Sequence, residues 1–192
     1  MSCLARCLPI CLCLLLPGLA PAAEPPQVDP ETGARTWSAS AGGVTLSLTQ
    51  ILPDQLRAFY VNRGFTPAQA EPYATSCVFM TVLRNDAAPG PVHFRSADWR
   101  VVKDGFERPP LSADHWIERL RAAGVTQPGL IAFRWAQFPA EQTYDPGGDW
   151  NQGMLSIGLP PGSRFDLRAR WDVRGESGEL LLKEVQCAQD DE

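Results

Sequence analysis

Residues 164–174 read Arg-Phe-Asp-Leu-Arg-Ala-Arg-Trp-Asp-Val-Arg, and apolar and charged side chains alternate along the whole stretch. Successive side chains of a β-strand point to opposite faces, so the charged set shares one face and the apolar set the other. The apolar face consists of Phe165, Leu167, Ala169, Trp171 and Val173. One buried and one solvated face is typical of an antiparallel sheet, and we therefore predict a mainly β fold.

Segments on both sides of this stretch extend the prediction. Residues 175–178 contain two glycines and predict a hairpin into a last strand over 179–187. Residues 76–84 are apolar on both faces, which indicates a central strand that is covered on both sides. With further alternation at 44–49 and 92–95, we predict about seven strands in an antiparallel β-sandwich. An immunoglobulin-like topology is one candidate arrangement.

Short helices are predicted as insertions between the strands. Apolar residues at helical spacing indicate a first helix over residues 52–60. Thr66 and Gln69 form a capping box, which marks the start of a second helix. Ser112 is a suitable N-cap for a third helix, and Gly124 a suitable stop.

The first 22 residues have the three parts of an export signal. Arg6 supplies the positive start, residues 7–16 are uncharged and apolar, and Ala20 and Ala22 suit cleavage after Ala22. The apolar run is shorter than the about 20 residues that a spanning helix needs. We therefore expect residues 1–22 to be removed, leaving a periplasmic or secreted protein without an integral membrane span. A retained membrane anchor is the alternative.

Cleavage leaves two of the six cysteines, Cys77 and Cys187. In an oxidising compartment they predict one disulfide, closing a loop of 110 residues (187 minus 77). Two buried thiols, or half of a metal site, are the alternatives. Residues 23–36 are Pro-rich and polar, and we interpret them as a flexible leader. Residues 37–192 then form a single β-sandwich domain held together by the disulfide.

Charge and motifs exclude several functions. The formal net charge is -5, and it becomes -6 (16 basic minus 22 acidic residues) once Arg6 is removed. A nucleic-acid partner is therefore not expected, since such proteins present a basic surface to phosphate groups. The chain has no Gly-x-Ser-x-Gly elbow and no His-Glu-x-x-His motif, and we predict no catalytic residue.

Four residues offer the soft ligands that suit copper, namely Met80, His93, His115 and Met154. They form no Met-x-x-Met or His-x-His cluster. Met80 lies within an apolar strand, and His93 falls on the outward face of its strand. Core packing for the methionines and ordinary surface positions for the histidines are therefore the competing interpretation.

We predict a strand over residues 131–138 and a long irregular loop over 139–153. Tyr144 and Trp150 of this loop suit recognition of a partner, because aromatic side chains bury a large area at low entropic cost. Three other loop residues offer hard oxygen atoms that suit calcium, namely Asp145, Asp149 and Asn151. The same residue types are also common turn formers beside glycine.

These patterns predict an exported, non-catalytic binding or accessory protein without a cofactor. Its 139–153 loop would engage a protein partner or a small exported ligand. A periplasmic copper-handling protein with Met and His ligands is the first alternative. The second is a small hydrolase that uses two carboxylates, such as Asp145 and Asp149. Cross-strand charge pairs account for the Arg-rich face of residues 164–174.

Overall fold

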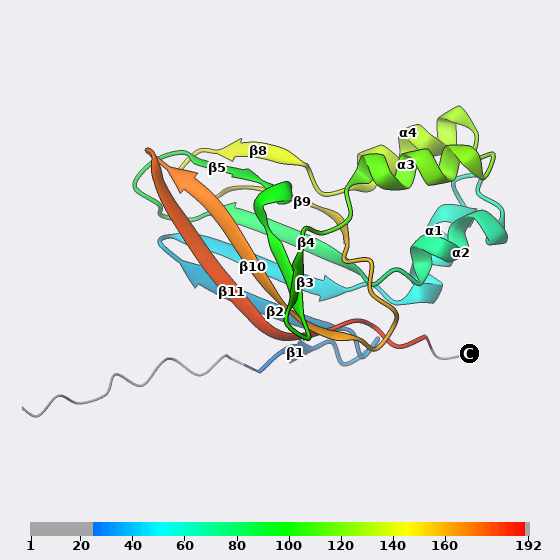
Figure 1. The fold of residues 1–192 in the computed structure, drawn as a ribbon, viewed down its shortest axis with the longest axis horizontal. Coiled ribbons are helices and arrows are strands. Elements are labelled where there is room, and N and C mark those ends of the chain that lie inside the picture. Colours follow the sequence, from blue (N-terminus) through cyan, green and yellow to red (C-terminus); the bar gives the residue numbers. More distant parts are fainter. Residues whose placement is uncertain (1–24, 191–192) are drawn as a thin grey trace, which may run out of the picture.

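The computed structural model describes residues 25–190, which form two antiparallel sheets in a sandwich (Figure 1). Sheet A has the order β1 (Gln27–Val28), β2 (Arg35–Ala41), β3 (Val44–Gln50), β4 (Val78–Asn85) and β9 (Asp149–Ser156). Sheet B contains β5 (Val92–Arg95), β6 (Arg100–Lys103), β7 (Phe106–Arg108), β8 (Glu141–Tyr144), β10 (Arg164–Val173) and β11 (Glu176–Gln186). The predicted antiparallel β-sandwich is confirmed.

The stretch that predicts the fold is β10, the middle strand of sheet B. β11 pairs along one edge of β10, while β6 and β5 pair one after the other along its opposite edge. Phe165, Leu167, Ala169 and Trp171 are buried in the core between the sheets. The predicted alternation and the predicted C-terminal hairpin are therefore confirmed.

β4 is the central strand that residues 76–84 predict. It lies between β3 and β9 in sheet A. Phe79 packs in the core between the sheets, whereas Met80 packs against the helices on the other face. The strand order of sheet A is a meander from β1 to β4 followed by β9, which differs from the A-B-E-D order of an immunoglobulin sheet.

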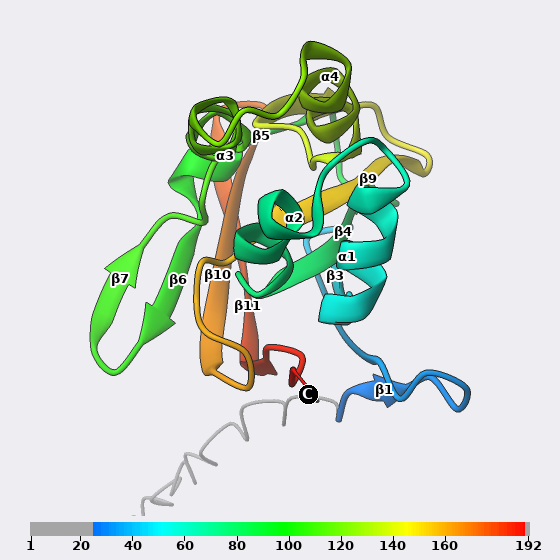
Figure 2. The ribbon, with the colours of Figure 1, turned by 90° about the vertical axis from the view of Figure 1, so that its right-hand side faces the viewer.

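Residues 25–190 contain four α-helices, which gather at one end of the sandwich (Figures 1 and 2). They are α1 (Pro53–Val61), α2 (Pro67–Ala74), α3 (Ala113–Ala122) and α4 (Gln127–Ala136). The first three confirm the predicted helices, and the caps at Thr66 and Ser112 form as expected. A second core lies between these helices and the ends of β4 and β9, and it includes Tyr60, Tyr73, Trp116, Phe133 and Met154.

α4 occupies residues 131–136 of the segment predicted as a strand over 131–138, and that prediction is wrong. The Thr126 side chain caps the helix by accepting from the Gly129 N–H at 3.4 Å. Leu130 and Phe133, three residues apart, are buried in the helical core. A short apolar run fits either structure by pattern alone, and here the helix is selected because it buries both side chains together.

Cys77 and Cys187 form the predicted disulfide, with their Cα atoms 5.1 Å apart. Cys77 immediately precedes β4 of sheet A, and Cys187 immediately follows β11 of sheet B. The disulfide therefore joins the two sheets. Both cysteines are buried, and Cys77 has a positive φ of 58°, which is uncommon for a residue other than glycine.

The described part of the predicted leader has regular structure. β1 pairs with the start of β2, and the Asp29 carboxylate accepts from the N–H groups of Glu31 and Thr32 in the intervening turn. The prediction of a flexible segment over 23–36 is therefore wrong for these residues. The predicted signal segment, 1–22, lies outside the described residues. Within residues 25–190, no helix is long and apolar enough to cross a membrane.

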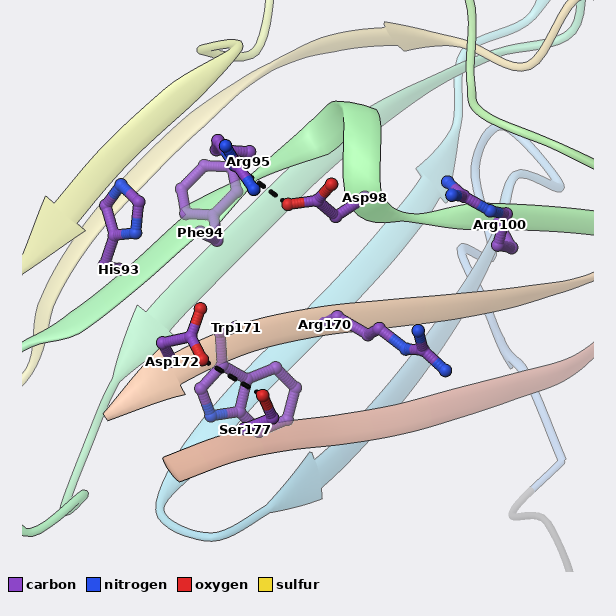
Figure 3. A pocket seen from close by; sticks show the side chains of 9 residues that line it. All are labelled: His93, Phe94, Arg95, Asp98, Arg100, Arg170, Trp171, Asp172 and Ser177. Atoms are coloured by element: carbon purple, nitrogen blue, oxygen red, sulfur yellow. Dashed lines mark hydrogen bonds and ion pairs between the residues drawn. The ribbon is translucent and has the colours of Figure 1, made fainter. Parts of the chain in front are cut away.

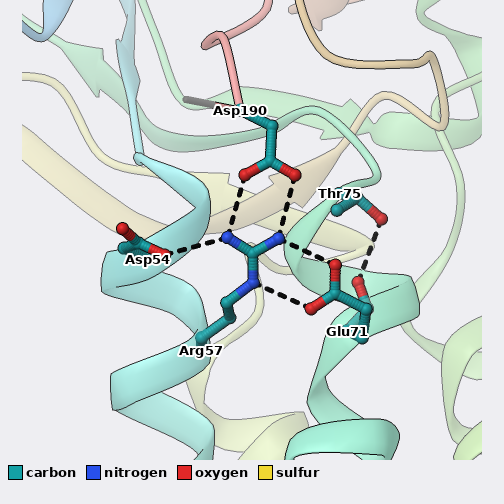
Figure 4. Close-up of polar contacts among 5 residues, drawn as sticks. All are labelled: Asp54, Arg57, Glu71, Thr75 and Asp190. Atoms are coloured by element: carbon teal, nitrogen blue, oxygen red, sulfur yellow. Dashed lines mark hydrogen bonds and ion pairs between the residues drawn. The ribbon is translucent and has the colours of Figure 1, made fainter. Parts of the chain in front are cut away.

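Arg57 of α1 ties the C-terminal segment to the helices (Figure 4). Its Nε and Nη2 donate to the Glu71 carboxylate of α2 at 2.8 and 2.7 Å. Its Nη1 and Nη2 donate to Asp190 at 2.8 and 2.9 Å, and Nη1 also donates to Asp54 at 2.9 Å. All five guanidinium N–H groups are thus used. The hydrogen bonds from Arg57 lower the pKa of Glu71 and the pKa of Asp190.

We expect Arg57→Met to destabilise the protein at pH 7 and to destabilise it less in acid. Because the folded-state pKa values of Glu71 and Asp190 are lowered, their pairing with Arg57 stabilises the fold fully above the unfolded-state values, near about pH 4. That stabilisation is lost as the pH falls through the folded-state values. Urea unfolding of the wild type and the variant at pH 7 and at about pH 3 measures the difference.

The matched control is Arg63→Met, because the Arg63 Nη1 donates to the backbone carbonyl of Phe59 rather than to a carboxylate. The destabilisation by this control is expected to vary less with pH. If Arg57→Met lowers the free energy of unfolding equally at both pH values, the pairing with Arg57 does not set the pKa values of Glu71 and Asp190.

Candidate functional site

The 139–153 segment is not the irregular loop that the sequence predicts. β8 and β9 occupy most of it, and residues 145–148 form the turn between them. Tyr144 is 1 % exposed, and its ring stacks on Phe94 with the centroids 5.6 Å apart. Its predicted role as a contact residue is therefore wrong, because the ring belongs to the core. Trp150 in β9 is 51 % exposed, as a contact residue would be.

Asp149 has a structural role in this turn. Its Oδ2 accepts from the Asp145 N–H at 3.1 Å, and its Oδ1 accepts from the Trp150 N–H at 2.9 Å. Asn151 lies farther along β9, opposite Leu83 of β4. Residues 25–190 contain no group of three or more His, Cys, Asp or Glu residues that could hold a metal ion. Asp149 thus acts as the turn former that the alternative interpretation expects.

The structure brings together two of the four predicted copper ligands. Met80 and Met154 are cross-strand partners in β4 and β9, on the side of sheet A that packs against the helices. Tyr60 Oη donates to Met154 Sδ at 3.4 Å. His93 lies in β5 of sheet B, and His115 is exposed in the first turn of α3. The thioethers are thus neighbours within a core, and neither imidazole joins them.

The outer face of sheet B has a polar hollow of about 230 Å³ (Figure 3). It forms where β10 changes its partner from β6 to β5, with a short 3₁₀ turn, Ser96–Asp98, between those strands. Trp99 Nε1 donates to the Arg170 carbonyl at 3.1 Å, so the indole replaces a sheet hydrogen bond at this gap. His93, Arg95 and Asp172 are among the residues that line the hollow.

Most charges on this face are paired within the chain, whereas Arg100 donates to the backbone carbonyls of Ala97 and Trp99. The ion pairs are Arg95–Asp98, Arg168–Glu107 and Arg170–Glu179, and His93 Nε2 forms a hydrogen bond of 2.7 Å with Glu141 Oε1. Asp172 accepts from the Ser177 hydroxyl at 3.1 Å. Pairs on such a solvated sheet face contribute little to stability. The pairing confirms the charge-pair interpretation of the Arg-rich strand and leaves few unused charges for a ligand.

A different surface lies between α3 and α4, and we call Ile117, Arg121, Leu130, Ile131, Arg134 and Trp135 the α3–α4 surface. These residues line a mainly apolar hollow of about 210 Å³. Ile117 and Leu130 are buried, while Ile131 is 49 % exposed and Trp135 is 85 % exposed. The almost fully exposed Trp135 extends this hollow into a larger apolar patch. Large apolar patches on soluble proteins mark interaction sites.

The rim of the α3–α4 surface is basic. Arg134 Nη2 lies 2.6 Å from Asp114 Oδ1 of α3. Arg121 has no carboxylate within 4.0 Å among the described residues. Trp and Arg are among the residue types most enriched at the energetic centres of protein interfaces. The surface can therefore take an apolar side chain into its hollow and a carboxylate at its rim.

Sequence reasoning missed this surface because it predicted a strand at 131–138. The signals for the helix are Thr126, Pro128 two residues later, and the three-residue spacing of Leu130 and Phe133. Because the face of α4 that carries Leu130 and Phe133 is buried, Trp135 lies on the opposite, exposed face. Comparison of the chain with protein-family models, with curated proteins and with solved structures finds no match.

Proposed function

We propose that the chain is an exported, non-catalytic binding protein that docks a protein partner through the α3–α4 surface. The observation that carries the proposal is the exposure of Trp135, at 85 %, beside Ile131 and the apolar hollow. Folding of this chain gains almost nothing from Trp135, because its ring stays in water. A partner that covers the ring gains the burial of a large aromatic side chain.

The α3–α4 surface also limits what the partner presents. Its hollow of about 210 Å³, floored by Ile117 and Leu130, fits one or two apolar side chains. The guanidinium of Arg121 favours a carboxylate on the partner, because charge complementarity steers and orients association. The partner in this proposal is thus a protein segment with apolar side chains and at least one acidic residue.

Two observations support export. The Cys77–Cys187 disulfide suits an oxidising compartment, since such bonds are rare in reducing ones. Residues 1–22 have the pattern of a cleaved signal, with Arg6 ahead of an apolar run and Ala22 at the cleavage point. The proposed partner is therefore another exported protein, or the exported part of a membrane protein.

We expect Trp135→Ala to abolish most partner binding without changing stability. The free energy of unfolding should stay within about 0.5 kcal/mol of the wild type, because the ring has few contacts to lose. The dissociation constant should rise at least about thirtyfold, which corresponds to a hot spot of about 2 kcal/mol. The partner is first co-purified from the exporting cell and then titrated as a purified protein in a calorimeter.

The matched control is Trp150→Ala. Trp150 is the other exposed tryptophan, and it lies outside the α3–α4 surface. It should leave the dissociation constant unchanged. If Trp150→Ala weakens binding and Trp135→Ala does not, the docking surface lies on β9 and the proposal is wrong. Native mass spectrometry could instead give a dimer for the wild type and a monomer for Trp135→Ala. That result would show that the surface binds a second copy of this chain.

A further inference from the structure

Two further hollows meet at Leu159, in the connection between β9 and β10. One hollow, of about 410 Å³, is lined by Leu111, Trp116, Leu159 and Pro160 among others. The other, of about 380 Å³, is lined by Leu159, Val101 and Phe106. We call the two together the Leu159 groove. In Figure 2 the connection between β9 and β10 runs between the β6–β7 hairpin and α2.

The Leu159 groove is mainly apolar, and a large aromatic side chain stands at one end of it. Phe106, at the start of β7, is 80 % exposed. Leu159 is half-buried and packs against the core between the sheets. An exposed phenylalanine and an apolar floor gain free energy when another chain covers them.

The rim of the Leu159 groove carries two guanidinium groups that form no ion pair within the described residues. Arg108 Nη2 donates to the backbone carbonyls of Ile157 and Gly158 at 2.7 and 3.1 Å. Arg119 lies over the ring of Trp116, with its Cζ 4.8 Å from the centroid. Asp104 and Glu107 also line the hollow beside Phe106, where they balance Lys103 and Arg108. The basic end of the Leu159 groove is therefore the hollow beside Trp116, where Arg119 is the one charged lining residue in the described part of the chain and attracts an acidic group.

Trp116 lines the Leu159 groove and also carries a buried donor without a partner among the described residues. Its side chain is buried, and its Nε1–H donates to no acceptor in residues 25–190. Most buried donors in folded proteins have an acceptor, so an unpaired indole N–H calls for a physical explanation. The indole ring of Trp116, rather than its buried N–H group, is therefore what this hollow presents to another chain.

We infer that the Leu159 groove binds an extended segment of a protein partner that carries apolar side chains and a carboxylate. The apolar side chains occupy the hollows on the two sides of Leu159. The carboxylate pairs with Arg119 at the rim. This groove uses Trp116 and Arg119 of α3, whereas the α3–α4 surface uses Ile117 and Arg121, so the two surfaces are separate.

The test uses a library of random 12-residue peptides displayed on phage and selected against the full, disulfide-bonded protein. The selected peptides are expected to combine apolar residues with Asp or Glu. Fluorescein-labelled copies are then titrated in anisotropy measurements. Arg119→Glu and Phe106→Ala should each raise the dissociation constant at least about tenfold, and changing the acidic peptide residue to its amide should have a similar effect.

Trp150→Ala is the matched control, because it removes an exposed aromatic residue that belongs to neither surface. Peptide affinity that is unchanged by this variant, and lowered by Arg119→Glu and Phe106→Ala, supports the inference. Selected peptides without acidic residues, or affinity that only Trp135→Ala lowers, would overturn it. Both groove variants change exposed side chains, and thermal melting that matches the wild type shows that they fold.

Discussion

Replacing Cys77 and Cys187 together by alanine is expected to lower the free energy of unfolding by about 4 kcal/mol. The disulfide joins positions 110 residues apart, and a loop of that length strongly restricts the unfolded chain. It also fixes the start of β4 to the end of β11, which holds the two sheets together. Alanine is preferred to serine, because both positions are buried and a hydroxyl there would need a partner.

Urea unfolding followed by tryptophan fluorescence measures this loss, and the melting temperature should fall by roughly 8–16 °C. The wild type in the presence of a reductant is the control, and its unfolding midpoint should match that of the double variant. A loss below about 1 kcal/mol would contradict the assignment of a major stabilising role to this bond.

Asn85→Leu is expected to cost about 3 kcal/mol, although it keeps the number and branching of the side-chain heavy atoms. Asn85 ends β4 and is fully buried. Its Nδ2 donates to the carbonyls of Gly90 and Tyr144 at 3.1 and 3.0 Å, and its Oδ1 accepts from the Ala88 N–H at 3.0 Å. Leucine would leave these three backbone groups without their partner, which is costlier than losing the hydrogen bonds alone.

Asn151→Leu is the control for Asn85→Leu, since the Asn151 side chain in β9 makes no hydrogen bond within the described residues. Its cost should stay within about 0.5 kcal/mol. Chemical unfolding of both variants under the same conditions gives the comparison. Similar losses for the two would mean that the buried hydrogen bonds of Asn85 contribute little.

The parts of the fold that the sequence predicts are those set by local pattern. The alternation in β10 requires only that one face be buried, and the capping box of Thr66 with Gln69 forms within a single helical turn. The pairing of Cys77 with Cys187 follows from counting, because these are the only two cysteines outside the predicted signal segment, 1–22. Such signals do not depend on what else packs nearby.

The parts of the fold that the sequence mispredicts, or does not reveal, depend on tertiary contacts. Tyr144 lies beside glycines and aspartates, which suggested an exposed loop, yet pairing of β8 with β5 places its ring against Phe94. The five hydrogen bonds of Arg57 join positions as far apart as 54 and 190, and no local pattern announces them. The same holds for the exposure of Trp135, which depends on α4 being a helix.

The proposed docking surface is tested most directly by photo-crosslinking in the cell that produces the protein. A photoreactive phenylalanine analogue replaces Trp135 in one variant and Trp150 in another, and adducts are identified by mass spectrometry. The account predicts one discrete adduct with a different exported protein from position 135 and none from position 150. An adduct from position 150 alone, or from neither position while the partner still co-purifies, would contradict docking through the α3–α4 surface.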